Sequence, residues 1–152
     1  MAKKVAINGF GRIGRLTARF LIQDPEIEIV GINDLTDNKT LAHLFKYDTA
    51  HGKFDGEVSA DDGYIYINGQ KIKATAERNP EKLPWKKLGV ETVLEATGVF
   101  RTKEKASMHI TAGAKRVIIS APGKDAVKTI VIGVNHSSLT KRSKVVSNAS
   151  CV

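Results

Sequence analysis

The chain has 152 residues, of which 41% are hydrophobic and 26% are charged, and its net charge is +8. This composition is that of an average water-soluble globular protein and excludes the disordered and collagen-like classes. Its uncharged stretches are much shorter than the roughly 20 apolar residues that a membrane span needs, and the N-terminus lacks the apolar run of a secretory signal. We therefore predict a cytoplasmic protein in which residues 1–152 form one domain.

The positive charge makes nucleic acid a candidate partner, because lysine and arginine side chains neutralise phosphates. The basic residues are scattered, however, and the densest group, Lys141, Arg142 and Lys144, has no aromatic residue among its members. A solvated loop is the favoured interpretation of this group. Attraction for an anionic cofactor or a phosphorylated substrate explains the sign of the charge equally well, and a basic nucleic-acid-binding module remains the alternative.

Short runs rich in β-branched residues alternate with helical patterns at the start of the chain. Such alternation is typical of βαβ units and a parallel sheet. Pro25 ends the first helical pattern, because the residue before a proline is biased out of the helical region. The predicted strands here are residues 4–8 and 28–33, and the predicted helices are residues 12–23 and 37–46.

The middle of the chain has the pattern of short antiparallel strands. Residues 64–67 and 70–75 are joined by Asn68-Gly69, the strongest short-range signal for a hairpin. Parallel-type alternation then resumes with nearly uniformly apolar strands, as a sheet covered on both faces requires. The other predicted strands are residues 55–59, 92–96, 116–120 and 129–132, and the last predicted helix is 103–112.

Directly after the first predicted strand comes the dinucleotide-binding spacing G-x-G-x-x-G. Gly9 permits a tight turn, Gly11 lets the backbone approach a pyrophosphate, and Gly14 lets the helix pack on the strand. The amides of Arg12 and Ile13 then stand at a helix N-terminus, where unpaired N–H groups and the dipole favour anions. Without their context, the three glycines could equally form a structural turn. Their place between a predicted strand and a predicted helix favours phosphate binding.

Asp34 lies at the end of the second predicted strand, directly after residue 33 and about 20 residues after Gly14, where an acidic residue is expected to meet the adenosine ribose. A capping or turn role is the alternative for this side chain. Its charge would repel the 2′-phosphate of NADP by about 1 kcal/mol in water and about 4 kcal/mol near a protein surface, which predicts at least about tenfold preference for NAD. These features predict an α/β fold of the Rossmann type, a doubly wound and mostly parallel sheet with a small antiparallel hairpin insertion.

The single cysteine, Cys151, cannot form an internal disulfide, and such a cysteine near a chain end is usually inert. The four histidines, His43, His51, His109 and His136, are interpreted as structural or solvated. No cysteine and histidine cluster has metal-ligand spacing, so we expect no metal site.

Several longer blocks now make a family resemblance specific. The sequence resembles glyceraldehyde-3-phosphate dehydrogenases, which are phosphorylating, NAD-dependent oxidoreductases of glycolysis, over essentially its whole length. The blocks that carry the resemblance are residues 6–15 (AINGFGRIGR), 32–35 (INDL), 46–52 (KYDTAHG), 95–100 (EATGVF), 118–122 (IISAP) and 147–151 (SNASC).

The resemblance implies a role in cofactor binding for each residue that matches the family pattern. Asp34 resembles the ribose-binding aspartate, Arg78 the residue that meets the adenine, and Ser120 a serine near the nicotinamide. For Thr97 and Ser120, strand-end hydroxyls that satisfy backbone groups are an equally good explanation from the residues alone. The implied cofactor-binding set is Asn8, Gly9, Phe10, Gly11, Arg12, Ile13, Asp34, Arg78, Thr97, Gly98, Phe100 and Ser120.

The resemblance also implies that Cys151 is the catalytic nucleophile and that Ser150 helps to hold a substrate phosphate. In this family the thiolate attacks the aldehyde of glyceraldehyde 3-phosphate, hydride passes to NAD, and phosphate releases 1,3-bisphosphoglycerate. The thiolate is the reactive form, so the chemistry needs a neighbouring base or a helix N-terminus. The family forms homotetramers and carries its catalytic histidine on a second domain that we expect to be absent from this chain.

One departure stands beside the cysteine, where Val152 replaces a threonine whose hydroxyl contacts phosphate in the family. We therefore expect the chain to be a truncated domain that binds NAD without turnover. Separation from the second domain would expose apolar surface, and such surface promotes association, so we expect the isolated domain to be a dimer or an aggregation-prone monomer. Erythrose-4-phosphate dehydrogenase shares the same glycine loop and cysteine motif and remains the alternative enzyme.

Overall fold

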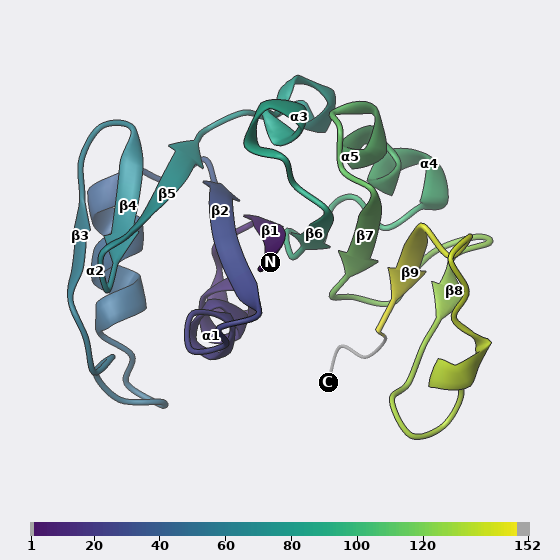
Figure 1. Ribbon diagram of the computed structural model, residues 1–152, viewed down its shortest axis with the longest axis horizontal. Coiled ribbons are helices and arrows are strands. Elements are labelled where there is room, and N and C mark those ends of the chain that lie inside the picture. Colours follow the sequence, from purple (N-terminus) through teal and green to yellow (C-terminus); the bar gives the residue numbers. More distant parts are fainter. Residues whose placement is uncertain (1, 149–152) are drawn as a thin grey trace.

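The computed structural model of the chain describes residues 2–148. These residues form a nine-stranded sheet in the order β3-β4-β5-β2-β1-β6-β7-β9-β8, and Figure 1 shows helices on both of its faces. The strands are β1 (Lys3–Asn8), β2 (Ile27–Asn33), β3 (Val58–Ala60), β4 (Tyr64–Ile67), β5 (Gln70–Thr75), β6 (Thr92–Glu95), β7 (Arg116–Ile119), β8 (Lys128–Thr129) and β9 (Val145–Ser147).

The direction of the strands confirms the predicted fold class. All neighbouring pairs from β5 to β8 in the sheet order are parallel. At the other end, β3, β4 and β5 form antiparallel pairs. Asn68 and Gly69 have φ angles of 50° and 81°, so both adopt the left-handed conformation that the tight turn between β4 and β5 requires.

Two groups of helices bury the two faces of the sheet. Ile7 lies in an apolar cluster with Phe45 of α2, whereas its neighbour Ala6 lies in a second cluster with Trp85 of α3. Successive residues of β1 are therefore buried on opposite faces, as a doubly wound sheet requires. One face is covered by α1 (Arg12–Leu21) and α2 (Asn38–Lys46), and the other by the short 3-10 helix η1 (Pro80–Lys82), α3 (Trp85–Leu88), α4 (Lys103–Ala106) and α5 (Met108–Thr111).

The start of α2 follows a local capping signal. Asp37 accepts hydrogen bonds from the backbone N–H of Thr40 at 3.0 Å and from its Oγ1 at 2.7 Å, and the helix accordingly begins at Asn38. The backbone bond from Thr40, followed by the hydroxyl bond, favours the ionised carboxyl and lowers the pKa of Asp37.

Several elements differ from the sequence prediction. The helix predicted over 103–112 is interrupted at Ser107, whose Oγ donates to the Lys103 carbonyl at 2.6 Å, a bond that bends helices. Strand β8 ends at Thr129 rather than residue 132, because the amide of Val131 donates to the Asn135 side chain at 2.7 Å instead of to a strand. The helices η1 and α3 and the 3-10 helix η2 (His136–Ser138) were not predicted, since such short segments show no helical periodicity.

No helix among residues 2–148 is both long and apolar enough to cross a membrane.

The parallel register brings the polar ends of four neighbouring strands into one row. Asn8 on β1 pairs with Asn33 on β2 and with Glu95 on β6, and Asn33 pairs with Thr75 on β5. Because β2 and β6 flank β1, the connections that follow them diverge to opposite sides. A crevice at the carboxyl edge of the strands is expected at such a switch point.

We predict that Gly14→Ala destabilises the fold, because the added Cβ would lie 2.1 Å from the backbone oxygen of Gly9. The expected loss in the free energy of unfolding is about 1–3 kcal/mol, measured by urea denaturation followed by circular dichroism. Gly11→Ala is the control: its Cβ would meet nothing within 4 Å, so its loss should stay below about 1 kcal/mol, the cost of a weaker N-cap. Equal losses in the two variants would contradict a packing role for Gly14.

Candidate dinucleotide-binding site

The glycine turn between β1 and α1 has the geometry that its spacing predicts. Gly9 has a φ angle of 92°, and a Cβ there would come within 2.8 Å of the Ala96 carbonyl carbon and the Thr97 nitrogen. The space around Gly11, by contrast, is open to 4 Å. Gly9 and Gly14 therefore serve the turn and the packing of the chain, while Gly11 leaves room for another molecule beside the backbone.

The N-terminus of α1 offers unpaired amides to that space. The first hydrogen bond from α1 back to the preceding turn joins the amide of Arg15 to the carbonyl of Gly11 at 2.9 Å, so the amides of Arg12 and Ile13 lie ahead of the bonded turns. No acidic side chain occupies the first turn of α1, and Gly11 has no side chain to cap it. This ten-residue helix therefore presents its N–H groups and positive dipole end to an anion.

Asp34 is fixed beside the glycine turn by two backbone amides. Its Oδ2 accepts from the N–H of Phe10 at 2.7 Å, and its Oδ1 accepts from the N–H of Thr36 at 2.9 Å. Each carboxylate oxygen retains a further acceptor site. The two hydrogen bonds hold the side chain in one place. Because it is only half-buried, it still faces solvent.

A hollow of about 300 Å³ opens at the carboxyl edge of the sheet, and we call it the edge hollow. Four residues of the predicted cofactor-binding set line it: Asn8, Arg78, Thr97 and Phe100. Asp34 and Gly98 are each next to a lining residue in the chain. The full lining consists of Asn8, Asn33, Leu35, Glu77, Arg78, Thr97, Val99 and Phe100.

Under the edge hollow, the row of strand-end side chains is joined by hydrogen bonds, and we call Thr75, Asn33, Asn8 and Glu95 the polar row. Thr75 Oγ1 donates to Asn33 Oδ1 at 2.7 Å, Asn33 Nδ2 donates to Asn8 Oδ1 at 2.8 Å, and Asn8 Nδ2 donates to Glu95 Oε1 at 2.5 Å. Asn8, Asn33 and Glu95 are only 2%, 4% and 1% exposed. Each of these three bonds within the row is donated in the direction of Glu95.

Glu95 is the end point of further donors. Its Oε2 accepts from the backbone N–H of Thr97 at 2.9 Å and from Thr97 Oγ1 at 2.6 Å. On the opposite side, Trp85 Nε1 lies 2.9 Å from His109 Nδ1, and His109 Nε2 lies 2.9 Å from Glu95 Oε1. Because an indole N–H only donates, Nδ1 of His109 is the acceptor and Nε2 carries the proton. His109 therefore accepts from Trp85 and donates to Glu95.

The structure does not bring every predicted residue to the edge hollow. Ser120 follows β7 and is absent from the lining, although its amide donates to the Glu95 carbonyl at 3.0 Å. The side chain of Phe10 is in the core, stacked on Phe45, so only its backbone is near the site. Ser150 and Cys151 lie outside the described residues.

Sequence reasoning found Asn8 but missed three other buried residues of this site. Asn33, Glu95 and His109 were not proposed for it, yet they support its floor. One signal was available: Asn8, Asn33 and Glu95 are each the polar last residue of an apolar strand. In parallel strands such residues gather at one edge.

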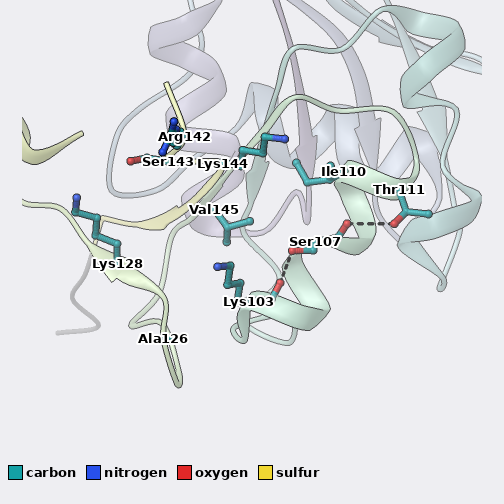
Figure 2. Close-up of a pocket in the computed structure, with 10 residues that line it drawn as sticks. All are labelled: Lys103, Ser107, Ile110, Thr111, Ala126, Lys128, Arg142, Ser143, Lys144 and Val145. Atoms are coloured by element: carbon teal, nitrogen blue, oxygen red, sulfur yellow. Dashed lines mark hydrogen bonds between the residues drawn. The ribbon is translucent and has the colours of Figure 1, made fainter. Parts of the chain in front are cut away.

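A larger hollow, of about 480 Å³, lies between α4, α5 and the segments that form β8 and β9, and it contains none of the predicted site residues (Figure 2). Figure 2 shows the side chains of Lys103, Lys128 and Lys144 pointing in different directions. The hydroxyls of Ser107 and Thr111 donate to carbonyls of their own helical segment, and Lys128 donates to a backbone carbonyl at 2.6 Å. These polar groups do not converge on one ligand, so the edge hollow remains the better candidate site.

Within residues 2–148, no group of three or more histidine, cysteine, aspartate or glutamate residues could hold a metal ion.

The glycine turn at a helix N-terminus, the fixed aspartate after β2 and the hollow at the strand ends define a dinucleotide-binding α/β domain. A comparison with protein families gives the particular kind. The family model described as "Glyceraldehyde 3-phosphate dehydrogenase, NAD binding domain" matches residues 3–103. The chain belongs to this family, and its cofactor is NAD.

Whole-chain relatives agree with this assignment. The chain is 55% identical to a glyceraldehyde-3-phosphate dehydrogenase of Clostridium pasteurianum over 97% of its own length and 44% of the relative's length. The corresponding protein of Thermotoga maritima is 55% identical, over 97% of this chain and 45% of the relative. That of Geobacillus stearothermophilus is 53% identical, over 99% and 45%. The chain thus spans less than half the length of these curated relatives.

We predict that Trp85 and His109 are energetically coupled through their hydrogen bond. Trp85→Phe should cost about 1–3 kcal/mol of unfolding free energy, because it leaves His109 Nδ1 buried without a donor. In a double-mutant cycle with His109→Leu, the coupling energy should fall between about 0.5 and 3 kcal/mol, measured by urea denaturation followed by circular dichroism. Additive losses would show that the bond contributes nothing to stability.

Proposed function

We propose that the adenosine half of NAD binds in the edge hollow, with Asp34 accepting hydrogen bonds from the ribose hydroxyls. The observation that carries this proposal is the position of Asp34: its carboxylate is fixed by two amides beside a hollow that Arg78, Thr97 and Phe100 line. The apolar side chains of Leu35, Val99 and Phe100 suit the faces of an adenine ring, while Arg78 offers a planar cation for stacking.

The pyrophosphate binds next to this hollow, at the glycine turn. Gly11 leaves space for its oxygens, and the amides of Arg12 and Ile13 donate to them. The bond from the Phe10 amide to Asp34 ties the turn to the ribose site. One rigid unit therefore holds two consecutive parts of the cofactor, which lowers the entropy cost of binding.

The nicotinamide half extends from the glycine turn towards the ends of β6 and β7. Support comes from the strand order, in which β6 and β7 follow β1 on the side away from β2. Gly98, with a φ angle of 77°, and Ser120 lie where these two strands end. Because Ser120 directly follows β7, it is the member of the predicted set that we place nearest to the nicotinamide.

In the whole protein, the reaction is the phosphorylating oxidation of glyceraldehyde 3-phosphate in a homotetramer. The Cys151 thiolate adds to the aldehyde carbon and gives a thiohemiacetal, and Ser150 helps to hold the substrate phosphate. Bound NAD supplies the hydride acceptor, so that the carbon becomes a thioester. Inorganic phosphate then displaces the thiolate and forms 1,3-bisphosphoglycerate. Relatives named as this enzyme support the proposal. Because residues 1–152 cover less than half of their length, we expect these residues by themselves to bind NAD without turnover.

Calorimetric titration with NAD and NADP tests the role of Asp34. The chain should bind NAD at least about tenfold more tightly than NADP, because the carboxylate repels a 2′-phosphate. Asp34→Asn removes the charge but keeps an acceptor for the Phe10 amide, so the preference should shrink several-fold. Asp61→Asn is the control, since Asp61 also accepts backbone amides but lies in the turn between β3 and β4. An unchanged preference in Asp34→Asn would refute the ribose role.

A second experiment tests the nucleophile in the full-length enzyme that contains this chain. Cys151→Ser should abolish the reduction of NAD by glyceraldehyde 3-phosphate, because a serine hydroxyl is far less nucleophilic than a thiolate. NAD binding, measured by titration, should persist. Retained turnover would assign the chemistry to another residue.

A further inference from the structure

The edge hollow has two walls, and each wall is anchored on a buried side chain below it. The first wall contains Glu77 and Arg78, and the amide of Glu77 donates to Asn33 Oδ1 at 2.8 Å. Asn33 Nδ2 also donates to the Glu77 carbonyl at 2.9 Å. Asn33 therefore forms hydrogen bonds with both the N–H and the carbonyl of the Glu77 backbone.

The second wall consists of residues 97–100, and it rests on Glu95. Thr97 donates to Glu95 through both its amide and its hydroxyl, and Thr97 Oγ1 accepts in turn from the amide of Val99 at 3.1 Å. Asn8 lies between the two anchors and bonds both Asn33 and Glu95. A continuous chain of hydrogen bonds thus connects the two walls beneath the hollow.

Glu95, at one end of this chain of hydrogen bonds, determines which group donates in each bond. A carboxylate only accepts, so Asn8 must turn its amide nitrogen towards Glu95 and its oxygen towards Asn33. Asn33 must then present its nitrogen to Asn8 and its oxygen to Thr75 and Glu77. The orientation of two amides, and with it the acceptor that holds the first wall, follows from the acceptor oxygens that Glu95 presents.

We propose that Glu95 is a positioning residue for the adenosine half of NAD: without touching the cofactor, it fixes both walls of the edge hollow. The inference rests on the proposed binding of NAD in that hollow. His109 supports it by donating to Glu95 Oε1, and its own orientation is set by Trp85. A buried ion is a poor source of stability, since its desolvation offsets its bonds, but it is an effective device for selecting one arrangement of polar groups.

Glu95→Gln is the informative variant, because it preserves the shape of the side chain but replaces one acceptor oxygen, at the end of the hydrogen-bond chain, with a donor. If the new amide nitrogen faces Thr97, this donor meets the donors of Thr97, which had bonded to Glu95. If it faces Asn8, the amides of Asn8 and Asn33 both reverse, and Asn33 then presents a donor to the donor of Glu77. Either arrangement loosens a wall of the hollow.

Two measurements on Glu95→Gln test the inference, one with cofactor and one without. Titration should show NAD binding weakened at least about tenfold, equivalent to about 1.4 kcal/mol. In the unliganded protein, amide hydrogen exchange followed by NMR should be accelerated at Thr97 or Val99, or at Glu77 on the other wall. The control is Ile65→Val or Ile65→Ala at a buried position of β4, whichever matches the urea midpoint of Glu95→Gln. This control should bind NAD within about twofold of the unsubstituted chain.

The outcomes separate the inference from the proposed function. Weakened NAD binding and faster wall exchange in Glu95→Gln, with neither in the matched Ile65 variant, support the positioning role. Unchanged exchange at all three wall amides overturns it, whatever happens to NAD. Equal loss of affinity in the Ile65 variant also overturns it, because the effect would then follow stability alone. Faster exchange with unaltered NAD affinity would show that the walls depend on Glu95 while the adenosine half binds elsewhere, which overturns the inference and the proposed location together.

Discussion

The carboxylate of Glu95 is the constraint on which the site depends. It is 1% exposed and accepts from Asn8, from Thr97 twice and from His109. A buried charge of this kind is tolerated only when hydrogen bonds replace its lost water. The need to satisfy it arranges donors from β1, α5 and the segment after β6 around one point. The carboxyl edge of the sheet is thereby a single hydrogen-bonded unit rather than a set of independent strand ends.

The glycine turn adds a second constraint, which is steric. The helix α1 can follow β1 closely only because Gly14 has no side chain against the Gly9 carbonyl, and Gly9 itself fits against the backbone at Ala96 and Thr97. Thr97 is also held by Glu95. The N-terminal end of α1 and the second wall of the edge hollow are therefore placed relative to each other by contacts that both involve Thr97. Preorganisation of this kind favours a ligand that bridges both regions, as a dinucleotide does.

Charge alone is a poor guide to the site in this chain. The net charge of +8 is spread over the surface, and the larger hollow between α4, α5 and β8 and β9 gathers basic side chains whose tips diverge. At the glycine turn the attraction for an anion comes instead from backbone amides and a helix dipole, which composition does not register. A binding site that is specific to this family can therefore coexist with a general excess of lysine that does not gather at any one site.

The sequence by itself determined the parts of this protein that local chemistry controls. The spacing of Gly9, Gly11 and Gly14 fixed the turn, Asn68-Gly69 fixed the hairpin, and apolar runs fixed the parallel strands, because each depends on residues close in the chain. Only the tertiary structure joined Thr75, Asn33, Asn8 and Glu95, which come from four strands, and turned His109 from an unremarkable helical residue into a buried donor. Strand register and helix docking create these contacts. The sequence pattern shows that polar residues end the strands, but it does not show which of them bond or that His109 joins them.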